Sequence, residues 1–127
     1  MRLDDTRVLL TNRRYAAAYY LCGYAVECSL KACIAKQVRR HDFPPDRRFI
    51  EDIYTHDLVR LVARAGLSDP LENQIKADAA IGTNWGIVKD WSERARYENK
   101  RRQEAEALFD AVSDENHGVM PWLRQYW

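Results

Sequence analysis

The chain has 127 residues, a length typical of one domain that can bury a core without metal or disulfide crosslinks. Its 20 basic and 19 acidic residues nearly cancel, to a formal net charge of +1. This balance argues against a protein that coats nucleic acid through its overall charge, although it allows a local basic patch. We expect a single domain over residues 1–127.

Cysteine usage and the N-terminal residues indicate the compartment. Cys22, Cys28 and Cys33 all lie in one predicted helix, which excludes a disulfide framework and spaces them poorly for a metal. We therefore expect buried free thiols, no metal site and the reducing cytoplasm. The first ten residues are too charged for a signal peptide, and no apolar run reaches the length of a membrane span. Without a glycine-rich phosphate loop or an HExxH motif, no cofactor is expected.

Residues 15–36 form the main predicted element. Apolar and aromatic side chains recur there every three or four positions, which predicts a long core helix that ends after Lys36. The helix can begin as early as Asp5, running through from the N-terminal segment. Gly23 leaves room for a close neighbour. Glu27 lies amid the apolar residues, and a buried carboxylate is costly unless it is paired. It is either satisfied by an arginine from another helix or functional.

Two adjacent prolines make residues 41–48 a loop. Arg40, Arg47 and Arg48 lie in or beside it. The loop is therefore either a solvated connector or a segment that contacts an anion.

A second helix is expected over residues 55–65, with Thr55 as its N-cap and Gly66 as its stop signal. His56 then falls in the first turn. It is either a packed or capping residue or a catalytic acid or base.

The rest of the chain also favours helices. In order, we expect a helix from Ser68 or Asp69 to about Ile81, a break at 82–86, a short helix over 87–94 with Val88 and Trp91 inward, a long helix over 100–112, a polar turn at 114–118 and a terminal helix over 121–126. No alternation typical of strands occurs. The predicted fold is an all-α, up-and-down bundle of four to five helices.

A basic segment between the last two long elements is the strongest candidate for binding nucleic acid. Cations and one aromatic ring gather there, and together they can hold phosphates and stack a base. The residues are Arg94, Arg96, Tyr97, Lys100, Arg101 and Arg102. Glutamates interleave with them, so the segment can equally be a solvated face of ordinary ion pairs.

Glu27 and Arg96 (or Arg94), with His56, make a second candidate constellation. If the segment after Trp91 folds against the main helix, Arg96 is the natural partner of Glu27. Such a group is either a structural ion pair that sets the register of the bundle or a hydrolytic site.

Three segments carry a family likeness: AAYYLCGYAVECSLKA, then THDL, then WSERARYE. In this order and at these separations they resemble the HEPN domain (higher eukaryotes and prokaryotes nucleotide-binding), in particular its short prokaryotic stand-alone members. The likeness runs from roughly Arg14 to the end. It implies an HEPN-like helical bundle that forms a homodimer. Many such proteins are ribonucleases, often toxins paired with a small nucleotidyltransferase antitoxin.

The ribonuclease members carry an Arg, four to six residues, then a His, and two such motifs form a metal-independent site in the dimer. This chain departs from that motif. The positions counted from Arg94 and from Arg96 hold no histidine: they are Asn99, Lys100, Arg101, Arg102 and Gln103. We therefore expect binding of RNA or a nucleotide, in a toxin–antitoxin or defence module.

Two alternatives remain. One is a metal-independent endoribonuclease with a non-standard site, in which Glu27 and His56 or Tyr97 act beside Arg96. The other is a non-catalytic dimeric module for protein interaction. The tyrosines and small residues of the main helix are either its dimer face or part of the core.

Overall fold

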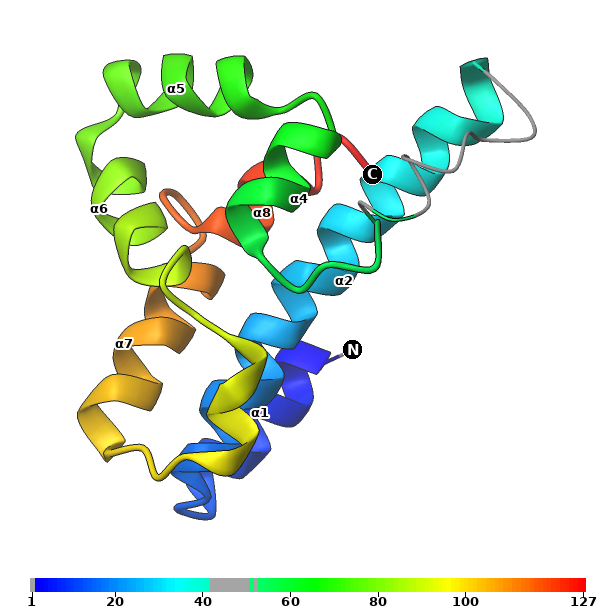
Figure 1. Cartoon of the computed structure of the whole chain (residues 1–127). Helices are drawn as coiled ribbons and strands as arrows, with labels where there is room; N and C mark the ends of the chain where they lie inside the picture. Colours follow the sequence, from blue (N-terminus) through cyan, green and yellow to red (C-terminus); the bar gives the residue numbers. More distant parts are fainter. Residues whose placement is uncertain (1, 42–50, 52) are drawn as a thin grey trace.

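The computed structural model describes residues 2–41, 51 and 53–127 (Figure 1). Every regular element in these ranges is a helix and none is a strand, which confirms the all-α prediction. The elements are α1 (Arg2–Thr11), α2 (Tyr15–His41), α4 (Leu58–Arg64), α5 (Ser68–Ala77), α6 (Ala79–Val88), the 3-10 helix η1 (Glu93–Tyr97), α7 (Arg102–Ser113) and α8 (Val119–Leu123).

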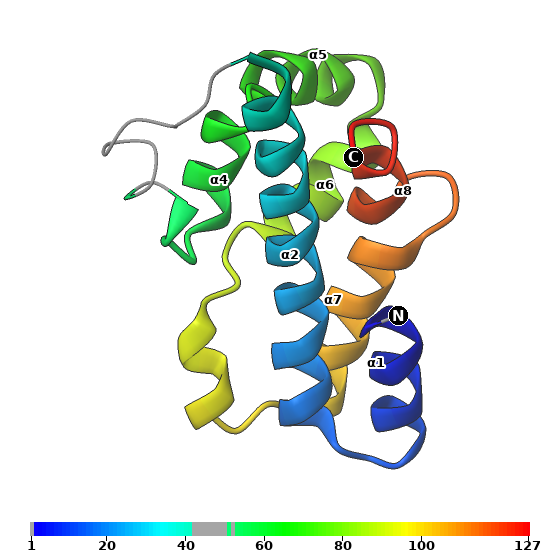
Figure 2. The same cartoon turned by 90° about the vertical axis from the view of Figure 1, so that its right-hand side faces the viewer.

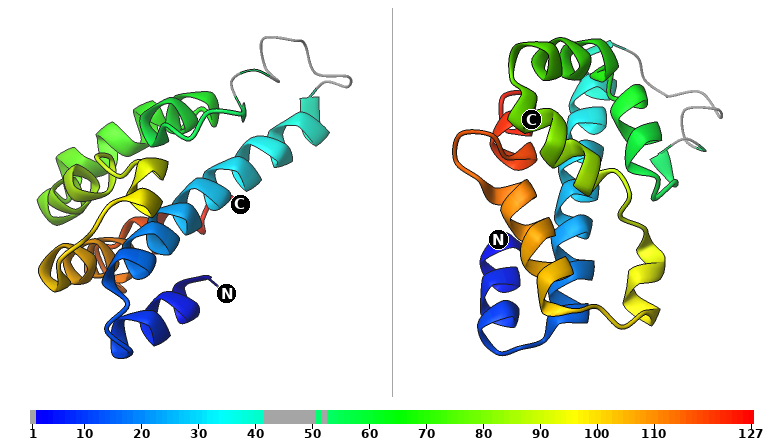
Figure 3. Two further views of the ribbon diagram at one scale, coloured as in Figure 1. Left: turned by 60° about the horizontal axis from the view of Figure 1, so that its bottom comes forward. Right: turned by 90° about the vertical axis from the view of Figure 1, so that its left-hand side faces the viewer.

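Helix α2 is the spine of the molecule. It contacts α1, α4, η1, α7 and α8. Figures 2 and 3 show α4 and η1 on one side of α2 and α1 on the other. Its apolar face is fully buried against residues of the other helices, with Val26 and Leu30 packed in one core with Leu61 and Leu108. None of the helices in the described ranges combines the length and the apolar character that a membrane crossing requires.

The N-terminal segment corrects one expectation, because α1 does not run into α2. The two helices form a hairpin that turns at Arg13, which has a left-handed φ of 60°. The Arg13 and Arg14 amides donate to the carbonyls of Leu10 and Leu9, the two bonds of a Schellman ending. A glycine would normally mark such a turn, so the sequence carried no obvious signal for it.

Helix α2 also extends five residues beyond the predicted end at Lys36, to His41. Arg39 and Arg40, in the predicted basic run after Lys36, therefore continue the helix. Most of the predicted proline loop, with Arg47 and Arg48, lies outside the described residues.

Helix α4 begins later than expected, and its N-cap is Asp57 instead of Thr55. The Asp57 carboxylate accepts the amides of Val59 and Arg60, and the Thr55 hydroxyl accepts the amide of Asp57. His56 consequently precedes the helix. The predicted stop is confirmed, since Gly66 has a φ of 73°.

The predicted break at 82–86 is wrong, because these residues lie inside α6. The chain breaks at Asp78, whose carboxylate accepts the amide of Ala80 and caps α6. Gly82 serves packing instead of breaking the helix: a Cβ there would lie 2.9 Å from Cγ2 of Ile75 on α5. The predicted helix over 87–94 is likewise absent, and η1 follows α6 after a short coil.

The two C-terminal helices form as predicted but with shifted bounds: α7 begins at Arg102 instead of residue 100, and α8 spans Val119–Leu123 instead of 121–126. Helix α7 buries Ala105, Leu108 and Val112 as its apolar stripe, and α8 buries Trp122. All three cysteines are free thiols, as expected, although only Cys22 and Cys33 are buried and Cys28 is half-buried. Burial raises the pKa of the Cys22 thiol to about 12.

Gly23 is where Trp91 packs across α2. A Cβ on Gly23 would lie 2.2 Å from Cδ1 and Nε1 of the indole, which is buried at 3% exposure. The Trp91 ring also lies 6.0 Å from the Tyr20 ring, centroid to centroid. The coil between α6 and η1 is therefore held against α2 by the Trp91 side chain, which packs in the space left by Gly23.

Substituting Gly23→Ala should lower the free energy of unfolding by about 1–3 kcal/mol, since the methyl group must displace the Trp91 indole. The matched control is Gly86→Ala in α6, where the added Cβ would have no atom within 4 Å apart from its chain neighbours and the adjoining backbone of α6. The control should be neutral or gain up to about 1 kcal/mol from helix propensity. Urea unfolding measures both variants, and an equal effect of the two would contradict the packing argument.

A second contact holds the start of α6 to the loop between α7 and α8. His117 Nδ1 donates to the Asp78 carboxylate at 2.7 Å, and the Asn84 side chain donates to the His117 carbonyl. The hydrogen bond to Asp78 raises the pKa of His117. The same bond, followed by the backbone amide of Ala80, lowers the pKa of Asp78.

This contact should stabilise the fold most between about pH 4 and pH 6.5, the ordinary pKa values of Asp and His. The raised pKa of His117 means that its contribution is complete below about pH 6.5 and is lost as the pH rises through the folded value. The lowered pKa of Asp78 means that its contribution is lost as the pH falls below about 4. The difference in Tm between the wild type and His117→Gln should peak in this window, and a difference that is flat with pH would contradict the assignment.

Candidate functional site

Glu27 and His56 form the centre of the candidate site. The Glu27 side chain, on α2, is only 2% exposed, and its Oε1 accepts a hydrogen bond from His56 Nδ1 at 2.8 Å. Its Oε2 lies 3.3 Å from Lys31 Nζ, one turn further along α2. Both oxygens of the buried carboxylate thus have a cationic or hydrogen-bonding partner, as burial of the charge requires.

The other ring nitrogen of His56 faces a second carboxylate. His56 Nε2 lies 3.1 Å from Glu93 Oε2, at the first residue of η1. The His56 side chain is 42% exposed and that of Glu93 is 46% exposed. One imidazole therefore links α2, the chain before α4, and η1, and its outer edge borders solvent.

Local caps hold both partners of this link in place. Thr55 and Asp57 fix the turn on either side of His56 through the hydrogen bonds that start α4. Ser92 accepts the amide of Arg94 and so fixes Glu93 as the first residue of η1. These capping residues are recognisable in the sequence, but the meeting of Glu93 with His56 depends on how η1 docks on α2.

The expected partner of Glu27 was Arg96 or Arg94, and this expectation is wrong. Glu27 is satisfied by His56 and Lys31, and Arg96 lies at the surface, its Cζ 4.8 Å from the centre of the Tyr97 ring. Tyr97 is 78% exposed. The arginine and the tyrosine stack together on the outer side of η1.

The cations of the basic segment fall into two groups: tethered ones, whose side chains pair with a nearby glutamate, and untethered ones, which form no such pair in the described part of the chain. Lys100 pairs with Glu98 at 3.2 Å and Glu104 at 3.7 Å, and it lies 4.5 Å from the centre of the Tyr19 ring. Burial disfavours the charge on Lys100, but the hydrogen bond to Glu98 and the neighbouring Tyr19 outweigh it and raise its pKa. These ion pairs are the ordinary surface pairing that the interleaved glutamates favour.

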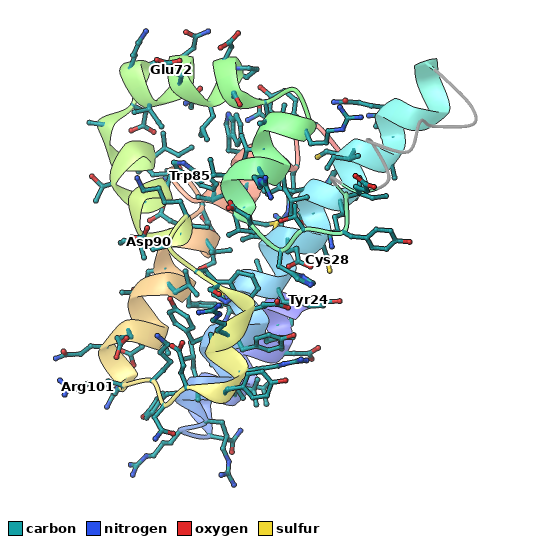
Figure 4. The ribbon with its side chains drawn as sticks, in the orientation of Figure 1. Tyr24, Cys28, Glu72, Trp85, Asp90 and Arg101 are labelled. Atoms are coloured by element: carbon teal, nitrogen blue, oxygen red, sulfur yellow. The ribbon has the colours of Figure 1, made fainter. Side chains whose placement is uncertain are left out.

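Arg102 is also tethered, through its Nε 2.7 Å from Glu106. By contrast, Arg94, Arg96 and Arg101 are exposed and form no ion pair with another residue in the described part of the chain. In Figure 4, Arg101 lies at the start of α7, at the lower end of the molecule, and points outward. The untethered guanidinium groups therefore extend from η1 to the start of α7.

The arrangement has the parts of an acid–base pair and of an anion-binding surface. A buried carboxylate that holds one imidazole nitrogen is the usual way to orient a histidine for proton transfer. Within the described residues no group of His, Cys, Asp and Glu side chains is suited to a metal ion. Glu93 and Lys31 are the members of the site that sequence reasoning missed.

A separate hollow of about 160 Å³ lies between α1, α2 and α8, and it contains none of these residues. Its lining is mainly apolar, and the half-buried Cys28 is part of it.

Replacing His56 with alanine should lower the free energy of unfolding by about 1–3 kcal/mol, because it leaves the buried Glu27 carboxylate short of a hydrogen-bond donor. Lys31→Ala is the matched comparison. It removes a partly exposed ion pair within one helix and should cost about 0.5 kcal/mol or less. Chemical denaturation measures the free energy of unfolding of both variants. A larger loss in Lys31→Ala than in His56→Ala would show that Lys31, and not His56, is the main partner of Glu27.

Comparisons with protein-family models, with curated proteins and with solved structures found no match to this chain.

Proposed function

We propose that this chain is an HEPN-type protein that binds single-stranded RNA through η1 and the start of α7. The observation that carries the proposal is the exposed stack of Arg96 on Tyr97. An aromatic face accepts a base of any sequence, and a guanidinium beside it binds the adjoining phosphate as a fork. The untethered Arg94 and Arg101 extend the basic surface along the strand.

A second candidate, a metal-independent ribonuclease, is favoured by the contact between Glu27 and His56. His56 would act as acid or base on the ribose 2′-OH, and Arg96 would stabilise the charge on the phosphorane. However, His56 does not follow Arg94 or Arg96 at the spacing of the ribonuclease motif, and its outer nitrogen lies 3.1 Å from Oε2 of Glu93. Binding without cleavage is therefore the function that we favour.

The proposal includes the partners that the HEPN resemblance implies, a second copy of the chain and a cognate nucleotidyltransferase antitoxin in the cytoplasm. No residue is assigned to either contact.

Binding is tested by fluorescence anisotropy with a short labelled single-stranded RNA. Tyr97→Ala should weaken binding by about 1–3 kcal/mol through loss of base stacking. Arg96→Ala should reduce the slope of log K against log salt by about 0.7, the value for one phosphate contact on a single strand. Lys76→Ala, on the exposed surface of α5 at the far end from η1 (Figure 1), removes the same charge and should leave both quantities unchanged.

The same preparations, incubated with total RNA without added metal, separate the two candidates. RNA that stays intact but is shifted on a native gel supports binding alone. Cleavage by the wild type that Arg96→Ala loses would favour the ribonuclease, and the absence of both cleavage and shift would overturn both candidates.

A further inference from the structure

The two nitrogens of the His56 ring differ in how firmly they are held. On the inner edge, Nδ1 donates to the Glu27 carboxylate, which is 2% exposed and also paired with Lys31. On the outer edge, Nε2 lies 3.1 Å from Oε2 of Glu93, which is about half-exposed. A carboxylate thus faces each ring nitrogen, and a carboxylate can only accept a hydrogen bond. The inner bond fixes the ring, and the outer contact lies where water and solutes can compete.

Glu27 and Glu93 place two carboxylates against Lys31 and the two nitrogens of His56. Glu93 supplies the negative charge on the outer side. When the ring is protonated, movement of the Glu93 carboxylate away from it leaves a positively charged N–H donor open to solvent. An anionic oxygen, as on a phosphate, makes the same charge-assisted hydrogen bond to an imidazolium that the carboxylate makes here.

The geometry of η1 adds an arginine next to this donor. In a 3-10 helix, side chains three residues apart lie above one another, so Arg96 follows Glu93 along one face of η1. An anion that replaces the Glu93 carboxylate on His56 would therefore approach the Arg96 guanidinium as well. Exposed ion pairs such as that of His56 with Glu93 contribute little to stability, so the exchange costs the fold little.

We propose that His56 Nε2 is a phosphate-binding position, which the Glu93 carboxylate fills in this structure and from which a phosphate group displaces it. The inference deepens the proposed RNA binding and rests on it, since the phosphate belongs to an RNA strand or to a free nucleotide. The Glu93 carboxylate competes with the phosphate for this position, so it lowers the affinity for every ligand that binds there. His56 is a binding residue in this arrangement, oriented by Glu27.

The test is a double-mutant cycle with Glu93→Gln and His56→Gln. Glu93→Gln keeps the size of the side chain and removes its charge, and it should bind a short single-stranded RNA with a 5′-hydroxyl about five-fold more tightly than the wild type. In the His56→Gln background the same change should give no gain. Glu72→Gln is the control for net charge, because Glu72 lies exposed on α5, far from η1 (Figure 4). It should bind as the wild type does.

A gain for Glu93→Gln that persists without His56, or that Glu72→Gln shares, would overturn the inference, because it would reflect overall charge. No gain at all would also overturn it, while RNA binding by the wild type would leave the proposed function standing. Circular dichroism confirms that each variant is folded before binding is measured.

A second readout needs no RNA and no substitution of His56. In NMR titrations with inorganic phosphate, the His56 Nε2 resonance should shift and saturate at a lower phosphate concentration in Glu93→Gln than in the wild type. If no RNA binds to either protein, the proposed function fails, and this titration alone decides the phosphate position: no shift in either protein overturns it. Adenosine monophosphate binding more tightly than the 5′-hydroxyl RNA would identify a free nucleotide as the source of the phosphate.

Discussion

The burial of one carboxylate in the middle of α2 is the constraint on which the rest of the arrangement depends. An unpaired ion in the interior costs several kcal/mol, a large part of the 5–15 kcal/mol that keeps a domain folded. On its own helix, Glu27 pairs with Lys31 at one oxygen, and the donor to its other oxygen comes from elsewhere in the chain. His56 supplies it, and its free edge then reaches η1 through Glu93. One buried charge thereby aligns three separate segments, and the candidate site is the place where they meet.

The sequence predicts well those features that are decided locally. The 3.6-residue period in α2 and α7 identifies their buried faces, since the same residues must face the core whatever they pack against. Gly66 ends α4 because its left-handed backbone suits glycine. Glu27 and His56 were also recognisable as candidate residues, one from its place among apolar neighbours and the other from its chemistry.

Features that depend on distant contacts, or on residues without strong conformational preference, were not predictable. Arg13 takes a left-handed turn that any sequence rule would reserve for glycine or asparagine. The glycines of α6 read as a break, although Gly82 is small because Ile75 packs on it. The partner of Glu27 was misassigned because helical spacing shows which side chains face inward but not which of several cations reaches them.

The seat of Trp91 on Gly23 has a consequence for how this protein can vary. Glu93 follows Trp91 by two residues, and Trp91 is fixed on Gly23. The length of the segment between them therefore determines which side chain lies beside His56. One inserted or deleted residue there would present Ser92 or Arg94 instead and replace an acid with a hydroxyl or a cation. After Tyr97 the chain is exposed until α7 begins, apart from the tethered Lys100. Relatives of this protein can therefore differ in length after η1 without disturbing the site, whereas a change in length before η1 would give the site a different charge.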